Sequence, residues 1–157
     1  MELASYSTWG FGARLQLRAD GTVLVESALR GDPERDGGVP PRRFGRLQPT
    51  ALAQLCELAR PAVSGEWAER YVQPRLSDGP ANLYTLRTDG GTRRIFEYGY
   101  QGPASLHRLR DALDEAVRDA SWTRWTGSEA EWLAATGWPG LDEWSRRLDI
   151  EFPPFSN

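Results

Sequence analysis

The residues that could carry chemistry are few in this sequence of 157 residues. It has one cysteine, Cys56, and one histidine, His107. A single cysteine cannot form an internal disulfide, and one cysteine with one histidine provides too few ligands for a zinc site. We therefore expect no metal and no cofactor. We interpret Cys56 as a small buried residue on the core-facing side of a helix. A nucleophilic role is disfavoured because only one histidine exists that could activate it. We interpret His107 as a surface residue.

Carboxylates give no clearer catalytic pattern. Glu66, Glu69 and Asp78 could be posed as the acid and base of a small hydrolase, but their spacing is arbitrary and no second feature supports it. The glycine-containing stretch 10–12 precedes a strand, whereas a dinucleotide fingerprint follows a strand and opens a helix. We predict no catalytic residue and expect that the chain is not an enzyme, with a small hydrolase as an alternative.

Charge and composition narrow the function classes. The net charge is −3, so the chain lacks the long-range attraction for phosphate backbones that basic domains have, and we expect no nucleic acid partner. With 39% hydrophobic and 26% charged residues, the composition is that of an ordinary globular protein. No stretch approaches the roughly 18 apolar residues of a membrane helix, and the first residues lack a signal-peptide pattern. We expect a cytoplasmic protein with no membrane association.

Two hairpins are predicted. Residues 11–18 alternate apolar and polar side chains, as a half-buried strand does. A three-residue loop, 19–21, with Gly21 in the left-handed region would then set Val23 and Val25 beside the strand's leucines. A second hairpin joins residues 83–88 to 92–100 through Asp89-Gly90-Gly91. Its expected register packs an aromatic stripe under a helix and leaves the other face partly open. The residues expected under the helix are Tyr84, Leu86, Arg94, Phe96, Tyr98 and Tyr100. Those expected on the open face are Thr85, Arg87, Arg93 and Glu97.

Two helices complete the domain. Pro49 opens an amphipathic helix that Pro61 stops, and residues 103–120 carry apolar side chains at helical spacing. The segment 29–43 reads as an exposed loop. The order hairpin, helix, hairpin, helix predicts an α+β fold: a four-stranded antiparallel sheet with both helices on one face. The open face is then either solvated or a partner surface.

A tryptophan-rich helical extension is expected after this domain. We divide the chain into a core domain, 1–120, and an extension, 121–157, packed on the same domain and holding five of the seven tryptophans. Ser128 and Glu131 form a capping box for a short helix that ends near Gly137. The tryptophans either extend the core, line a groove for carbohydrate or peptide, or form a dimer surface. The extension is also acidic, which could steer a basic partner.

Three features together resemble a known family. Trp9-Gly10-Phe11-Gly12 leads the first strand, Leu47-Gln48-Pro49 precedes a helix, and Tyr84-Thr85-Leu86 with Gly90-Gly91 precedes the last strand and leucine helix. Over residues 6–117 this pattern resembles the emfourin-type inhibitors of bacterial metalloproteases. The resemblance implies a compact cytoplasmic antiparallel α+β protein whose glycine-rich opening segment, here Trp9, Gly10, Phe11 and Gly12, touches an enzyme's active cleft. The long loop and the tryptophan tail depart from that family.

We therefore expect a non-catalytic protein-binding module, of inhibitor or immunity type, that blocks a partner enzyme such as a protease or a toxin. A carbohydrate-binding domain that uses the tryptophan tail is an alternative, and a homodimer is another. The expected partner-binding residues lie in the opening segment and in the acidic tail: Trp9, Gly10, Phe11, Gly12, Trp138, Asp142 and Glu143. The sequence does not name the partner, the oligomeric state or the role of the 29–43 loop.

Overall fold

The computed structural model describes residues 2–8, 13–27, 42–74, 76 and 79–138. The chain divides into two compact units, residues 1–125 and 126–157. The described part of the first unit contains a mixed sheet and three helices, and that of the second unit contains one helix. The tryptophan-containing segment 121–125 belongs to the first unit, where residues 121–124 form a strand of the sheet.

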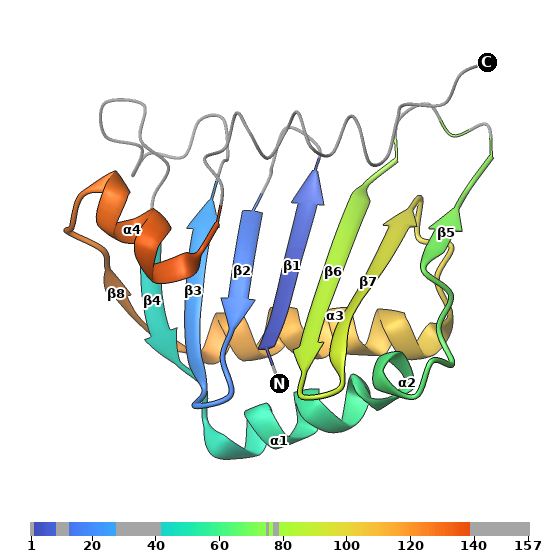
Figure 1. The fold of residues 1–157 in the computed structure, drawn as a ribbon, viewed down its shortest axis with the longest axis horizontal. Helices are drawn as coiled ribbons and strands as arrows, with labels where there is room; N and C mark the ends of the chain where they lie inside the picture. Colours follow the sequence, from blue (N-terminus) through green and yellow to red (C-terminus); the bar gives the residue numbers. More distant parts are fainter. Residues whose placement is uncertain (1, 9–12, 28–41, 75, 77–78, 139–157) are drawn as a thin grey trace. The chain divides into compact units, whose positions relative to one another are not determined.

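The first unit is built on an eight-stranded sheet with the strand order β5-β7-β6-β1-β2-β3-β4-β8 (Figure 1). The strands are β1 (Glu2–Thr8), β2 (Ala13–Leu17), β3 (Thr22–Ser27), β4 (Arg42–Arg46), β5 (Arg70–Val72), β6 (Ala81–Thr88), β7 (Gly91–Tyr98) and β8 (Ser121–Arg124). All neighbouring strands are antiparallel except β5 and β7, which run parallel. The predicted α+β class, with an antiparallel sheet, is confirmed. The four expected strands are β2, β3, β6 and β7, and β1 joins the two hairpins between β2 and β6.

The helices are α1 (Pro49–Leu58), α2 (Arg60–Val63) and α3 (Ala104–Asp119). These helices cover one face of the sheet. In Figure 1, α3 lies behind the sheet and runs across the strands. Helix α3 buries a leucine stripe, as predicted, and Pro49 opens α1, as predicted. Cys56, however, is exposed, so the prediction that it faces the core is wrong. The buried residue of α1 is Leu55, and the next position on a helix points about 100° away from it.

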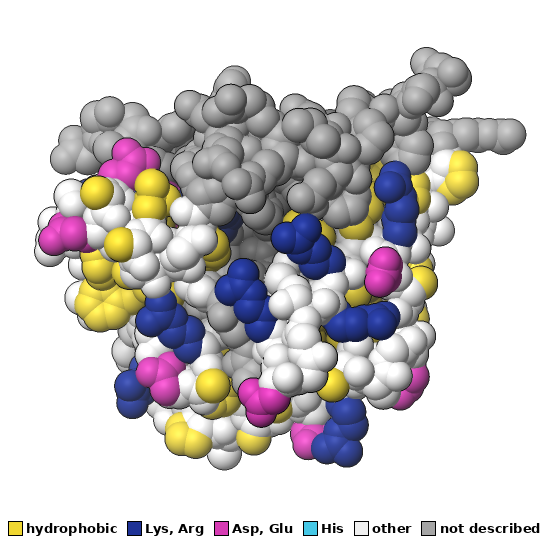
Figure 2. Space-filling model, viewed as in Figure 1, with side chains coloured by type: hydrophobic (Ala, Val, Ile, Leu, Met, Phe, Trp, Pro, Cys, Tyr) yellow, Lys and Arg dark blue, Asp and Glu magenta, His cyan; other side chains and the backbone are white. Residues whose placement is uncertain are grey.

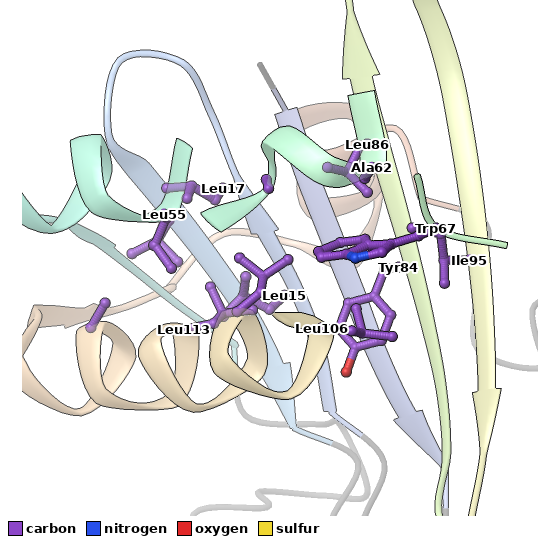
Figure 3. Close-up of a cluster of buried hydrophobic side chains, with 14 of the residues drawn as sticks. Leu15, Leu17, Leu55, Ala62, Trp67, Tyr84, Leu86, Ile95, Leu106 and Leu113 are labelled. Carbon is purple, nitrogen blue, oxygen red and sulfur yellow. The ribbon is translucent and has the colours of Figure 1, made fainter. Parts of the chain in front are cut away.

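The core lies between the sheet and these helices (Figure 3). Leu15 and Leu17 of β2 and Tyr84 and Leu86 of β6 meet Leu106, Leu109 and Leu113 of α3, and all seven are at most 8% exposed. Trp67, which follows α2, closes one end of this cluster. Its indole Nε1 donates to Ser105 Oγ at 2.9 Å, so its polar atom is satisfied inside an apolar site.

The first hairpin has the predicted register. Leu15 lies opposite Val25 and Leu17 opposite Val23, so the leucines and valines share the helix-covered face. Gly21 has φ +82°, a left-handed conformation that glycine adopts without a steric penalty. The turn is closed by Arg18 N, which donates to Thr22 O at 2.9 Å.

The second hairpin has a different register from the expected one. Thr88 pairs with Gly91, so the turn contains two residues, Asp89 and Gly90, rather than three. A shift of one residue turns every side chain of one strand to the opposite face. Tyr84 and Leu86 remain under the helices as expected, but their partners are Ile95 and Arg93. The expected face assignment of β7 is therefore wrong: Arg93 and Glu97 lie on the helix-covered face, and Arg94, Phe96 and Tyr98 lie on the other.

The segment expected to be a loop, 29–43, lies mostly outside the described residues. Its last two described residues, Arg42 and Arg43, already belong to β4. In the second unit, α4 (Glu129–Thr136) begins with the predicted capping box: Glu131 N donates to Ser128 Oγ, and Ser128 N donates to Glu131 Oε2 at 2.7 Å. The helix ends at Gly137, as predicted, and this glycine has a left-handed conformation.

Candidate functional site

Most of the residues predicted to bind a partner are outside the described part of the chain. These are Trp9, Gly10, Phe11, Gly12, Asp142 and Glu143. Trp138 is described and partly buried. Its ring meets that of Trp132 edge to face, with centroids 6.0 Å apart, and its backbone N donates to Thr136 Oγ1 at 3.2 Å. Trp132 is fully buried, which leaves it no exposed face on which a sugar could stack.

Among the described residues, the buried carboxylates are Glu26 and Glu97, and each is the centre of a cluster of polar or charged groups. The first lies on the helix-free face of the sheet. Arg14 of β2 and Arg42 of β4 lie directly opposite Glu26 of β3, one on each side. The arginine side chains are 4% and 5% exposed and that of Glu26 is 0% exposed. The sheet register alone therefore places one acidic group between two basic groups.

Both oxygens of the Glu26 carboxylate are engaged in this first cluster. Arg14 donates to Oε2 through Nε, at 2.8 Å, and through Nη2. Arg42 Nε donates to Oε1 at 2.8 Å. A buried carboxylate is tolerated only when it is paired and hydrogen-bonded, and charge-assisted bonds to guanidinium groups are the strongest kind available. Glu26 therefore joins three strands and has no oxygen turned toward solvent.

The second cluster lies on the helix-covered face, where β7 leads into α3. Glu97 is 0% exposed. Its Oε1 accepts from Gly102 N at 2.9 Å and lies 2.8 Å from His107 Nε2, and its Oε2 lies 3.4 Å from Asn82 Nδ2. The expectation that His107 is only a surface residue is wrong, because 29% of its side chain is exposed and the ring is fixed on a buried acid.

The chain between β7 and α3 is shaped to serve Glu97. Gly99 and Tyr100 both have positive φ, +72° and +55°, and this turn brings Gly102 back toward the carboxylate. A Cβ at Gly102 would lie 2.8 Å from Glu97 Oε1, so only glycine lets the backbone come this close. Tyr100 holds an unfavourable conformation for a non-glycine residue. Its ring lies under the Arg110 guanidinium, 4.6 Å from the centroid.

Tyr84 lies in the same core region and gives a prediction about alkaline stability. Burial, with the charge of Glu97 as a second cause, raises the pKa of Tyr84 above its ordinary value. The folded state therefore binds this proton more tightly than the unfolded state, whose tyrosine pKa is about 10. The resulting stability is complete below that pH and declines as the pH rises above it. We expect Tyr84→Phe to flatten the fall in unfolding free energy between about pH 9.5 and 11.5.

Urea denaturation at a series of pH values measures this effect. Tyr100→Phe is the matched control: it removes a phenol from a half-exposed side chain, leaves Tyr84 intact and should keep the wild-type decline. A decline in Tyr84→Phe as steep as in the wild type would show that the buried phenol does not govern alkaline stability.

The helix-free face of the sheet carries more arginines than the sequence led us to expect. Figure 2, drawn from the same side as Figure 1, shows arginine side chains spread over this face. The strand alternation places six arginines there, namely Arg14, Arg42, Arg46, Arg70, Arg87 and Arg94. Three of them were missed because they belong to β4 and β5, which have no recognisable strand pattern. Leu24, Leu83 and Phe96, at most 8% exposed, share the face.

Among the residues that the structure describes, no group of three or more His, Cys, Asp or Glu side chains could hold a metal ion. Within the same part of the chain, no helix is long and apolar enough to cross a membrane. No protein-family model matches the chain, and searches of the curated proteins and of the solved structures give no match.

Proposed function

We propose that the chain is a non-catalytic, cytoplasmic protein-binding module of inhibitor or immunity type, which binds and blocks a partner enzyme or toxin. The observation that supports this most is how the described buried acids, Glu26 and Glu97, are used. Each has both oxygens engaged by groups of the chain itself and none of its side chain exposed. Groups in that state hold strands and loops in place and cannot reach a substrate.

Because neither buried acid can reach a substrate, we propose that the protein acts by binding through its rigid, charged surface. Strands and helices present their outer side chains in fixed positions, and a preorganised surface binds with a smaller entropic cost than a flexible one. The overall excess of acidic groups, with a net charge of −3, favours encounter with a basic partner surface. We propose that the opening segment with Trp9 and Phe11, and the acidic tail with Trp138, Asp142 and Glu143, contribute contacts.

Besides the carboxylates considered in the sequence, the structure offers a hydrolase alternative His107, which combines partial exposure with a buried acid behind it. That arrangement orients an imidazole, but the same Glu97 oxygen also accepts from Gly102 N and so holds the turn before α3. His107→Ala separates the two interpretations. In the binding interpretation the variant retains partner affinity and the chain has no turnover to lose.

The proposal is tested by affinity capture with the tagged full chain in lysate of the source organism, followed by reconstitution with the purified partner. We expect a 1:1 complex in which the partner's own enzymatic activity is suppressed. The absence of a stoichiometric complex, together with turnover by the chain itself on a panel of hydrolase substrates, would contradict the proposal.

A further inference from the structure

A groove runs between α1 and α3 on the outer surface of the helical layer. Its apolar part is made of four alanines, one from α1 and three from or directly after α3. These are Ala51, Ala112, Ala116 and Ala120. The three on the α3 side are spaced four residues apart, so they lie on one stripe of the helix and keep its side shallow. Their small side chains leave the space between the two helices unfilled.

The rim of the groove is polar, and its hydrogen-bonding capacity is unused within the described part of the chain. Helix α1 and the residue before it contribute Gln48, Thr50 and Gln54, and α3 contributes Glu115 and Asp119. All five side chains are exposed, and none takes part in a hydrogen bond or ion pair with another described residue of the first unit. Their state is the opposite of Glu26 and Glu97, whose oxygens are all engaged.

The described residues that line the groove carry two carboxylates and no basic group. Glu115 and Asp119 are one helical turn apart, on the same face, where two like charges repel each other. A cation bound between the two carboxylates would relieve this repulsion, whereas a phosphate group would add to it. The local charge therefore selects a basic ligand and disfavours nucleic acid.

We propose that this groove binds an arginine side chain presented by an exposed segment of the partner protein. The inference rests on the proposed protein-binding function and names the chemistry of the contact. The aliphatic part of an arginine packs on the alanines, and its planar guanidinium offers five donors. Those donors match the carboxylates of Glu115 and Asp119 and the amide oxygens of Gln48 and Gln54. A lysine ammonium, with its compact charge, engages fewer of these spread acceptors.

A defined probe tests the groove without the partner. The probe is a short blocked peptide with two arginines, compared with the same peptide in which uncharged citrulline replaces each arginine. Backbone amide chemical shifts of the full chain are followed during titration up to millimolar peptide. We expect the arginine peptide to shift the amides of Ala51, Ala112 and Ala116, and the citrulline peptide to shift none of them. Equal shifts with both peptides, or shifts confined to other surfaces, would overturn the proposal.

Matched variants separate the two groove carboxylates from net charge. Glu115→Gln with Asp119→Asn should weaken binding of the arginine peptide about tenfold or more, because charge pairs across an interface contribute strongly to affinity. The control pair, Glu69→Gln with Asp89→Asn, removes the same charge at exposed positions, and asparagine suits the β6–β7 turn. It should bind like the wild type. Equal weakening in both pairs would show a general charge effect and refute the groove.

A filling variant gives a second, independent readout. Ala112→Leu keeps helix propensity nearly unchanged and places a larger side chain on the partly exposed wall of the groove. It should abolish the peptide shifts while the thermal unfolding curve stays close to that of the wild type. Light scattering of the full chain is measured alongside: a dimer that dissociates in the filled variant would assign the groove to a second copy of this chain and overturn the proposal.

The proposed function and this inference can fail separately. A partner complex that forms equally well with the groove pair and with the control pair would refute the groove and leave the protein-binding function standing. A groove that binds the arginine peptide in a chain that forms no complex with any protein would refute the function, and with it the partner arginine that we propose.

Discussion

Replacing Glu26 by glutamine is expected to lower the free energy of unfolding by about 3–5 kcal/mol, the usual cost of removing one member of a buried ion pair. Two guanidinium groups, at most 5% exposed, then face an amide in place of a carboxylate. Glutamine has almost the same shape, but its NH2 group meets donors where the second carboxylate oxygen accepted a bond. The loss is electrostatic, because no cavity forms.

Urea denaturation at neutral pH measures the Glu26→Gln loss. Glu57→Gln is the matched control: Glu57 is also paired with an arginine, Arg60, at 2.6 Å, but both side chains are about two-thirds or more exposed. Exposed pairs contribute about 0–1 kcal/mol, so this variant should unfold nearly like the wild type. A Glu26→Gln loss no larger than that of the control would mean that the buried cluster does not stabilise the sheet.

Replacing Glu97 by alanine is expected to cost about 2–4 kcal/mol, since a buried acceptor with several donors disappears and a cavity remains. Gly102 N and the His107 ring lose their acceptor, and the turn through Gly99 and Tyr100 loses its anchor. We therefore expect faster hydrogen exchange at the first turn of α3 in addition to the global loss. Both effects follow from the position of Glu97 between β7 and α3.

His107→Ala separates the contributions around Glu97. It removes one partner of the carboxylate, keeps the Gly102 bond and should cost about 1 kcal/mol, the usual net value of one hydrogen bond. Denaturation and hydrogen exchange on the two variants give the comparison. A loss in His107→Ala as large as in Glu97→Ala would assign the stability to the histidine contact and contradict the anchoring role of the Gly102 bond.

Local signals predicted the parts of the fold that depend on neighbouring residues. Gly21 fixed the first turn because a three-residue loop needs a left-handed residue, and the apolar alternation on both strands agreed with that register. Ser128 and Glu131 announced α4 through a capping box that involves only adjacent backbone groups. The leucine spacing predicted α3 and its buried face for the same reason, because the whole pattern lies within one helix.

The predicted register of the second hairpin is wrong because Asp89-Gly90-Gly91 fits both a two-residue and a three-residue turn. The aromatic residues of β7 favoured the wrong choice, since Phe96 and Tyr98 resemble a core stripe more than Glu97 does. Glu97 is nevertheless on the helix-covered face, where Gly102 and His107 satisfy it. Hydrophobicity alone cannot predict that such an acid is buried. The groups that bind it lie in and after the turn that follows β7, and the register of the hairpin determines where that turn lies.

The site was less predictable than the fold. The pairing of Arg14 with Glu26 follows from the correctly predicted first hairpin, in which Leu15 opposes Val25, so that signal was present. Arg42 was missed because β4 is formed by long-range pairing, and its first two residues fall within the segment 29–43 that is predicted to be a loop. The groove was not predicted, because it depends on how α1 packs against α3, and the spacing of Ala112, Ala116 and Ala120 does not reveal that packing.

The central claim is that the buried carboxylates maintain the fold and that the exposed surface, with the groove carboxylates, binds a basic partner. The most direct test is calorimetric titration of the captured, purified partner into the full chain carrying Glu115→Gln with Asp119→Asn, beside Glu69→Gln with Asp89→Asn. We predict that the first pair loses at least tenfold in affinity at wild-type stability and that the second pair binds normally. Equal affinity in both pairs would contradict the account.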